Sequence, residues 1–137
     1  MKPVYETTVV ATGGRNGKIT SADGVLDIDV RIPKEMGGSG GAFSNPEQLF
    51  AAGYAACFDS ALNYMALLEN VKITSTITAT VGVLMPTKTE FKLTVNLVAQ
   101  IDGVDRAIAQ QLLEKAHQTC PYSRAINGNV DVNISLS

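Results

Sequence analysis

The sequence has little excess charge, two cysteines and one histidine. Its formal net charge is −2, and no basic block or basic–aromatic stripe indicates binding to nucleic acid or to a charged membrane surface. Two cysteines and one histidine without a close ligand cluster argue against a metal site. The first residues lack the apolar run of a signal peptide, so we expect a cytoplasmic protein. In that reducing compartment the cysteines are either two buried thiols or a redox pair, not a structural disulfide.

A nucleotide-binding loop is also missing. Residues 33–43, P-K-E-M-G-G-S-G-G-A-F, form a flexible glycine-rich stretch. They lack the G-x-x-x-x-G-K-[ST] spacing, and no strand-to-helix G-x-G-x-x-G unit is present. The glycines therefore do not predict phosphate binding.

What the sequence does contain is one long helix, predicted over residues 44–70. Ser44 or Asn45 can cap its first amides, and Pro46 fits the first helical position. Apolar and small residues occupy nearly every face of the helix, which predicts that it is covered on more than one side. The run is too interrupted to predict a membrane span. We expect the central buried helix of a soluble protein, with Cys57 near its middle.

The rest of the chain predicts strands and a second helix. Alternating or strand-like composition indicates strands over residues 4–12, 25–32, 72–85, 90–100 and 130–136, and an apolar stripe indicates a helix over residues 105–119. A hairpin links the third and fourth of these strands and favours antiparallel pairing. This order predicts an α+β fold with a single domain over residues 1–137.

Cys57 has two interpretations. Cysteine is often simply buried, and a cysteine in the middle of a helix is usually a packing residue. Alternatively it is a nucleophile, which requires a lowered pKa because only the thiolate attacks. The helix dipole fades within the first turn and burial favours the neutral thiol, so neither can ionise Cys57. A reactive Cys57 therefore needs a cation from elsewhere in the protein.

Cys120 lies in H-Q-T-C-P-Y-S at the end of the second predicted helix. Pro121 places it at or just past the helix end, where the dipole disfavours a thiolate, so Cys120 should be the less acidic thiol. If the two cysteines act together, Cys57 attacks and Cys120 resolves; otherwise they are two unrelated buried thiols. His117 lies one turn earlier and could touch Cys120, but a solvated histidine near a helix C-terminus is the favoured interpretation.

Several segments together resemble the Ohr/OsmC family, and within it the organic hydroperoxide resistance branch. The segments are T-G-G-R-N-G-K at 12–18, S-A-D-G-V-L-D at 21–27, G-G-S-G-G-A at 37–42, N-P-E-Q-L-F-A-A-G-Y-A-A-C-F at 45–58, C-P-Y-S at 120–123 and G-N-V-D-V at 128–132. The run at 45–58 combined with a distant C-P-Y-S is highly specific, and the similarity spans nearly the whole chain.

The resemblance implies a thiol peroxidase that acts as an intertwined homodimer, with antiparallel sheets packed around a long central helix. In this sequence the family's attacking cysteine matches Cys57 and its resolving cysteine Cys120. The thiolate-stabilising arginine matches Arg15, and the acid that orients it matches Glu47. The implied substrates are organic hydroperoxides, and the implied reductant is a dihydrolipoyl group on a partner protein. No metal, haem or flavin is implied.

Arg15 is the candidate for the cation that a reactive Cys57 needs, because its guanidinium is permanently charged and can pair with thiolate and carboxylate together. An arginine in a surface turn is on its own more often solvated. Ten residues of straight helix separate Glu47 from Cys57 by roughly 15 Å. We therefore expect either that Arg15 and Glu47 serve the partner subunit's cysteine or that the helix is broken between them. Candidates for an apolar pocket accepting the organic tail are Met36, Phe43, Phe50, Tyr54 and Tyr122, although each could equally be ordinary core packing.

Three alternatives remain open from the sequence. The first is a peroxidase of the OsmC branch with a different substrate preference. The second is a non-catalytic dimer that binds apolar ligands, and the third is a redox sensor that uses the same disulfide to switch a partner.

Overall fold

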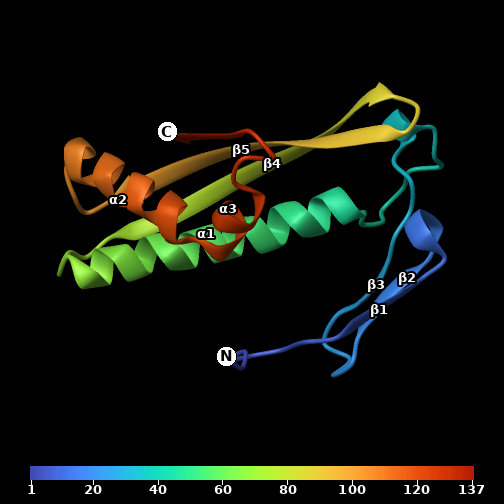
Figure 1. Ribbon diagram of the computed structural model, residues 1–137, viewed down its shortest axis with the longest axis horizontal. Coiled ribbons are helices and arrows are strands. Elements are labelled where there is room, and N and C mark those ends of the chain that lie inside the picture. Colours follow the sequence, from blue (N-terminus) through green and yellow to red (C-terminus); the bar gives the residue numbers. More distant parts are fainter. The chain divides into compact units, whose positions relative to one another are not determined.

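The computed structural model describes residues 1–137 and divides the chain into two compact units, Met1–Leu49 and Phe50–Ser137. Each unit has its own three-stranded sheet (Figure 1). The α+β class with antiparallel pairing and a long helix is confirmed. A single domain over residues 1–137 stays a prediction.

The first unit contains a small antiparallel sheet of β1 (Val9–Thr12), β2 (Lys18–Ser21) and β3 (Asp27–Asp29). A short 3₁₀ helix, η1 (Gly14–Asn16), connects β1 to β2, and a second, η2 (Lys34–Met36), follows β3. The predicted strands over residues 4–12 and 25–32 were too long, and β2 was not predicted. Strand-like composition forms a strand only where a neighbouring strand pairs with it, and Val4 and Tyr5 are exposed instead.

The long helix α1 runs unbroken over Pro46–Leu68, as predicted. The side chain of Asn45 caps it by accepting a hydrogen bond from the backbone N–H of Gln48 at 2.8 Å. One face is buried, consisting of Tyr54, Phe58, Ala61, Leu62 and Ala66. On the opposite face Tyr64 and Leu67 are exposed in the single chain, so the expectation that α1 is covered on more than one side stays a prediction.

The second unit is built on β4 (Thr74–Thr87), β5 (Glu90–Asp102) and β6 (Val132–Leu136). The hairpin of β4 and β5 is antiparallel, as predicted. β6 pairs parallel to β5, with Val132 opposite Val95, because the intervening helices carry the chain back to the start of a parallel neighbour. Phe91 lies near the hairpin tip and is exposed.

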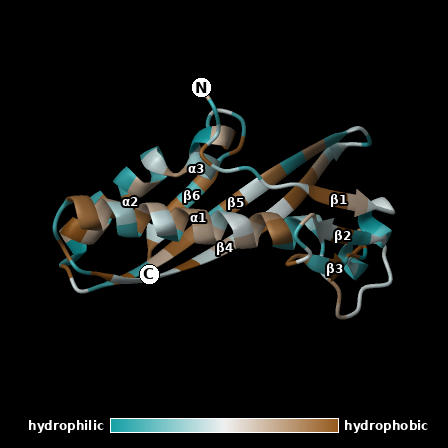
Figure 2. Ribbon diagram, turned by 90° about the horizontal axis from the view of Figure 1, so that it is seen from below, coloured by the Kyte–Doolittle hydropathy of each residue, from teal (hydrophilic) through white to brown (hydrophobic).

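Helix α2 (Arg106–Thr119) begins after Asp105, whose side chain accepts a hydrogen bond from the N–H of Ile108 at 2.9 Å. It is followed at once by α3 (Pro121–Ile126), which was not predicted. Figure 1 shows α2 and α3 on the same side of the long sheet as α1, and Figure 2 shows hydrophobic residues recurring along α1, β4 and β5. The predicted stripe of α2 is buried at Leu112, Leu113 and Ala116, whereas Ile108 is exposed at the edge of the stripe.

None of the helices combines the length and the hydropathy that crossing a membrane requires.

Candidate active site

The two cysteines, 63 positions apart in the sequence, lie side by side in the second unit. Their Sγ atoms are 3.8 Å apart and both thiols are free. Cys120 is completely buried, whereas Cys57 on α1 is partly exposed. The structure therefore brings together the two predicted thiols and leaves Cys57 as the more accessible one.

Cys120 holds its place because it ends one helix and starts the next. Its N–H donates to the carbonyl of Ala116 in α2 at 2.8 Å, and its own carbonyl accepts from the N–H of Arg124 in α3 at 3.0 Å. The prediction that it lies just past a helix end is confirmed. The dipole argument that made it the less acidic thiol counted only α2. The N-terminus of α3 presents the opposite end of a helix dipole at the same residue, so helix dipoles do not rank the two thiols.

The surroundings of Cys57 favour its neutral thiol. Burial raises the pKa of Cys57, the backbone N–H of Tyr122 opposes that rise, and the neighbouring Cys120 adds to it. The expectation that burial works against a thiolate at this position is confirmed. A cation remains necessary if Cys57 is to be ionised near neutral pH.

Arg15 and Glu47 form a bidentate ion pair within the first unit. Nη1 donates to Oε2 at 2.7 Å and Nη2 to Oε1 at 2.6 Å. Hydrogen bonding to Arg15 lowers the pKa of Glu47, and hydrogen bonding to Glu47 raises the pKa of Arg15. Arg15 keeps 35% of its side chain exposed against 15% for Glu47, so the guanidinium retains an accessible surface. The expected pairing of this arginine with this acid is therefore present.

The turn that carries Arg15 needs its glycines. Gly13 has φ +76°, a left-handed conformation that favours glycine. At Gly17 an added Cβ would lie 1.7 Å from the carbonyl oxygen of Thr12, which no side chain permits. The sequence thus uses glycine on both sides of η1 to present Arg15 at a fixed place.

Three of the predicted pocket residues form an aromatic cluster beside Cys57. The ring centroids of Phe50, Tyr54 and Tyr122 lie between 5.9 and 6.3 Å from one another. Gly53 makes room for Tyr122, since an added Cβ would lie 3.1 Å from its hydroxyl. Tyr54 is completely buried, so it backs the cluster, whereas Phe50 and Tyr122 keep exposed surface.

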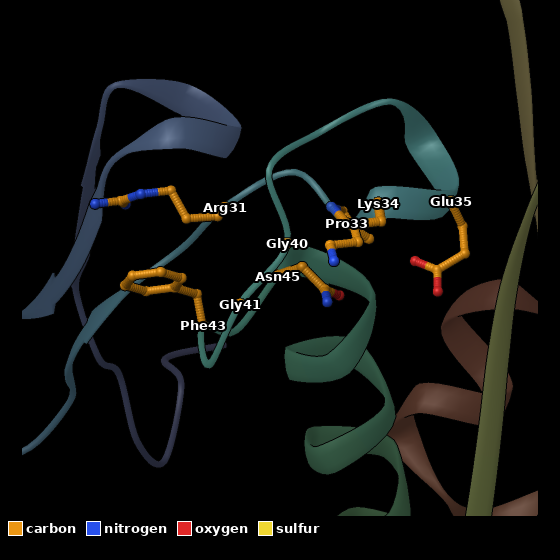
Figure 3. Close-up of a pocket in the computed structure, with 8 residues that line it drawn as sticks. All are labelled: Arg31, Pro33, Lys34, Glu35, Gly40, Gly41, Phe43 and Asn45. Carbon is orange, nitrogen blue, oxygen red and sulfur yellow. The ribbon is translucent and has the colours of Figure 1, made fainter.

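The other two predicted pocket residues, Met36 and Phe43, lie in the first unit. Phe43 lines a hollow of about 320 Å³, and the guanidinium of Arg31 lies over its ring at 4.6 Å from the centroid (Figure 3). Charged side chains, including Lys34, contribute much of this hollow. Met36 does not line this hollow, and the assignment of Met36 and Phe43 to an apolar substrate pocket stays a prediction.

Ser123 was not predicted to be a site residue, and His117 was predicted to be a solvated histidine. The structure shows the Ser123 hydroxyl between the hydroxyl of Tyr54 at 2.6 Å and Nδ1 of His117 at 2.9 Å. The signal that could have found Ser123 is its spacing of three from Cys120 in C-P-Y-S. The structure contains no group of three or more His, Cys, Asp or Glu side chains that could hold a metal ion.

Comparison with known proteins identifies the family of this fold. The model of the OsmC-like protein family matches residues 38–135, so the chain belongs to that family. The resemblance to its organic hydroperoxide resistance branch is also confirmed. The chain is 48% identical to the organic hydroperoxide resistance protein OhrB of Bacillus subtilis, covering 97% of this chain and 98% of that protein.

Solved structures give the same result. An organic hydroperoxide resistance protein from Legionella pneumophila superposes with a TM-score of 0.95 at 46% identity, covering 99% of each chain. A protein from Vibrio cholerae, described as a putative organic hydroperoxide resistance protein with captopril bound in one of the active sites, superposes with a TM-score of 0.93. It is 44% identical and is covered over 94% of its length by 99% of this chain.

Proposed function

We propose that this chain is a thiol peroxidase that reduces organic hydroperoxides to alcohols. The observation that carries the proposal is the 3.8 Å contact between the Sγ atoms of Cys57 and Cys120. A small approach of these atoms gives a disulfide, whose bond length is about 2.05 Å. The proposal is supported by relatives that are named for organic hydroperoxide resistance.

The cycle has three steps. The thiolate of Cys57 attacks the terminal oxygen of the hydroperoxide, the O–O bond breaks, and the alcohol leaves as Cys57 becomes a sulfenic acid. Cys120 then attacks the Cys57 sulfur, forming the disulfide and releasing water. An external dithiol reduces this disulfide by thiol–disulfide exchange. Cys57 suits the first step because it is the more exposed thiol, and Cys120 suits the second because it is buried against it.

Arg15 and Glu47 are the proposed activators of Cys57. The bidentate pair fixes the guanidinium while leaving part of it accessible. The sequence left open a break in the helix between Glu47 and Cys57, but α1 is continuous there. Ten residues of helix span roughly 15 Å. We therefore assign the pair of one subunit to the Cys57 of a partner subunit.

That assignment requires a homodimer with two active sites. The exposed apolar residues Tyr64 and Leu67 on α1 support it, because a second copy would cover this face. The relative from Vibrio cholerae is described with captopril bound in one of its active sites, so more than one active site is described for that protein. The proposed reductant is a dihydrolipoyl group on a partner protein, and a cytoplasmic location suits such a reducing cycle.

Steady-state turnover tests the proposal. Purified protein is supplied with dihydrolipoamide or with thioredoxin, and the consumption of cumene hydroperoxide is compared with that of hydrogen peroxide. We expect many turnovers with cumene hydroperoxide and dihydrolipoamide, and slower turnover with hydrogen peroxide. Consumption of a single equivalent would instead indicate a redox sensor, and no consumption a ligand-binding protein. The substrate comparison also separates this branch from the OsmC branch.

A further inference from the structure

The hydroxyl of Ser123 joins the helices α1, α2 and α3. Its Oγ lies 2.6 Å from the hydroxyl of Tyr54 on α1 and 2.9 Å from Nδ1 of His117 on α2, while Ser123 itself belongs to α3. Ser123 is only 3% exposed, and Tyr54 is completely buried. A single hydroxyl group therefore connects α3 to both of the other helices in the interior of the second unit.

The hydrogen bond between Tyr54 and Ser123 runs beside the contact between the two thiols. Tyr54 precedes Cys57 by three positions on α1, and Ser123 follows Cys120 by three positions. Three residues of helix advance about 4.5 Å along the axis and lie on one face. Two contacts, one between oxygens at 2.6 Å and one between sulfurs at 3.8 Å, therefore join the same two segments about one turn apart.

The helix α3 depends on such contacts for its position. It has six residues, Pro121–Ile126, and a helix of this length is not stable on its own. The ring of Tyr122 packs against those of Phe50 and Tyr54, with 6.3 and 5.9 Å between centroids. Apolar packing has no preferred direction, whereas a hydrogen bond requires a particular distance and angle. The hydroxyl pair therefore determines more closely than the rings where Cys120 lies.

The hydroxyl pair contributes position more than stability. Each buried hydroxyl gives up its hydrogen bonds to water, so the net gain in free energy from their mutual bond is small. A hydroxyl left alone in the interior is strongly disfavoured, however. Moving α3 away from α1 would break the bond and leave the buried Tyr54 hydroxyl without the partner that it has in this structure. The pair therefore selects one arrangement of α3 against α1.

The second step of the proposed cycle depends on where Cys120 lies. The Cys120 sulfur attacks the Cys57 sulfur, the S–O bond of the sulfenic acid breaks, and hydroxide leaves with the Cys120 proton as water. A second hydroperoxide competes with this step by oxidising the sulfenic acid to a sulfinic acid. Misplacing a reacting group by about 1 Å costs on the order of 100-fold in rate. The position of Cys120 therefore decides which of the two reactions is faster.

We propose that Ser123 is a positioning residue that keeps Cys120 within reach of Cys57 while the disulfide is open, an inference that rests on the proposed function. Ser123 acts through its hydrogen bond to Tyr54, and His117 holds the same hydroxyl from the side of α2. Ser123 takes no part in the attack on the hydroperoxide. Its effect is to favour the disulfide over overoxidation of Cys57.

Single-turnover kinetics separates the two steps. Reduced native protein and Ser123→Ala are mixed with one equivalent of cumene hydroperoxide, and hydroperoxide consumption and disulfide formation are followed by rapid quench and mass spectrometry. We expect Ser123→Ala to consume hydroperoxide at the native rate and to form the disulfide about 10-fold more slowly. With excess hydroperoxide, the fraction of sulfinic Cys57 formed per turnover should rise by a similar factor. Ser60→Ala, the same change at an exposed residue of α1 three positions from Cys57, should match the native protein in both steps.

Tyr54→Phe tests the bond from its other end. This variant and the double variant Tyr54→Phe/Ser123→Ala should form the disulfide about as slowly as Ser123→Ala, because all three lack the same hydrogen bond. A native rate of disulfide formation in either single variant would overturn the proposal. So would equal slowing of both steps in Ser123→Ala, or slowing that multiplies in the double variant. The proposed function fails separately, if native protein consumes no cumene hydroperoxide.

Discussion

At the scale of the residue, Arg15 donates one hydrogen bond from each terminal nitrogen to the Glu47 carboxylate. Lysine has a single terminal nitrogen and cannot reproduce this bidentate geometry. We expect Arg15→Lys to lower peroxidase activity and Arg15→Ala to lower it on the order of 100-fold, the usual effect of removing one charge-stabilising group. The reason is that Cys57 would lose the counter-charge that we propose for it, while burial continued to raise its pKa. The Cys57 pKa is measured by iodoacetamide alkylation across pH.

Lys18→Ala is the matched control for that experiment. It removes a positive charge from an exposed residue of the same unit whose partner is Asp27. Its alkylation profile should match that of the native protein. An unchanged Cys57 pKa in Arg15→Ala would contradict the role given to the guanidinium.

The ion pair also has a pH dependence of known sign. Because hydrogen bonding to Arg15 lowers the pKa of Glu47, the pair stabilises the fold fully above the ordinary glutamate pKa. This stability is lost as the pH falls through the lowered pKa of the folded protein. Urea denaturation of native protein and Glu47→Gln should therefore differ near neutral pH, and the two proteins should converge in stability in acid.

Cys120 is the residue whose loss should leave one half-reaction intact. The variant Cys120→Ser should consume one equivalent of cumene hydroperoxide and then accumulate sulfenic or overoxidised Cys57, visible by dimedone labelling and mass spectrometry. Cys57→Ser should consume none. Continued turnover by Cys120→Ser with dihydrolipoamide, at the native rate, would mean that the disulfide is not part of the cycle.

At the scale of elements, the close packing of α1 against Tyr122 gives a test of the aromatic cluster. Gly53→Ala adds a Cβ that would lie 3.1 Å from the Tyr122 hydroxyl and 3.3 Å from its Cε2. We expect the ring to shift and KM for cumene hydroperoxide to change several-fold. Thermal stability should change little, because the strain of shifting the Tyr122 ring is offset by the helix propensity of alanine, which exceeds that of glycine by up to about 1 kcal/mol.

The double variant Gly53→Ala/Tyr122→Phe provides the control, because it removes the nearest Tyr122 atom. It should recover part of the native KM. A KM unchanged in Gly53→Ala would argue that Tyr122 does not line the path of the substrate.

The predictability of the elements followed their length. The helix over Pro46–Leu68 and the β4–β5 hairpin carry a sustained period and standard cap and turn residues, so both were predicted. β2 and α3 are too short to show a period, and tertiary pairing or a proline start decides them. The parallel pairing of β6 with β5 was not predicted. The hairpin favoured antiparallel pairing, whereas the strand–helix–strand order from β5 to β6 favours a parallel crossover.

The sequence predicted the thiols and the ion pair of the candidate site but not the hydrogen bonds around them. The family motifs pointed to Cys57 and Cys120, which lie in contact, and to Arg15 and Glu47, which form an ion pair. Hydrogen bonding in the interior was not predictable. Ser123 has no motif of its own outside C-P-Y-S, and its significance comes from two partners that folding brings to it.

At the scale of the whole molecule, large apolar side chains are exposed in both units. Those of the second unit are Tyr64, Leu67, Leu68, Leu84, Met85, Phe91, Ile108 and Tyr122. A second copy covering α1 would remove Tyr64 and Leu67 from water. We expect Leu67→Glu to shift analytical ultracentrifugation profiles from dimer to monomer, because burying an unpaired carboxylate is costly.

Gln110→Glu introduces the same charge at an exposed position of α2 and should remain dimeric. If Arg15 acts on the cysteine of a partner subunit, the monomeric Leu67→Glu protein should also lose peroxidase activity. A monomer with native turnover would refute the shared site, and a Leu67→Glu dimer as tight as the native one would place the interface elsewhere.

The contact between the two sulfurs has a consequence for how well Cys57 resists overoxidation. With 3.8 Å between the Sγ atoms, there is no room for a water molecule between them. Cys120 therefore already lies beside Cys57 when the Cys57 sulfur is oxidised to the sulfenic acid. A second peroxide molecule must diffuse in from solvent, whereas Cys120 needs only a small shortening of the distance between the two sulfurs. In the proposed cycle, the protein should therefore survive repeated exposure to concentrated oxidant instead of being overoxidised by it.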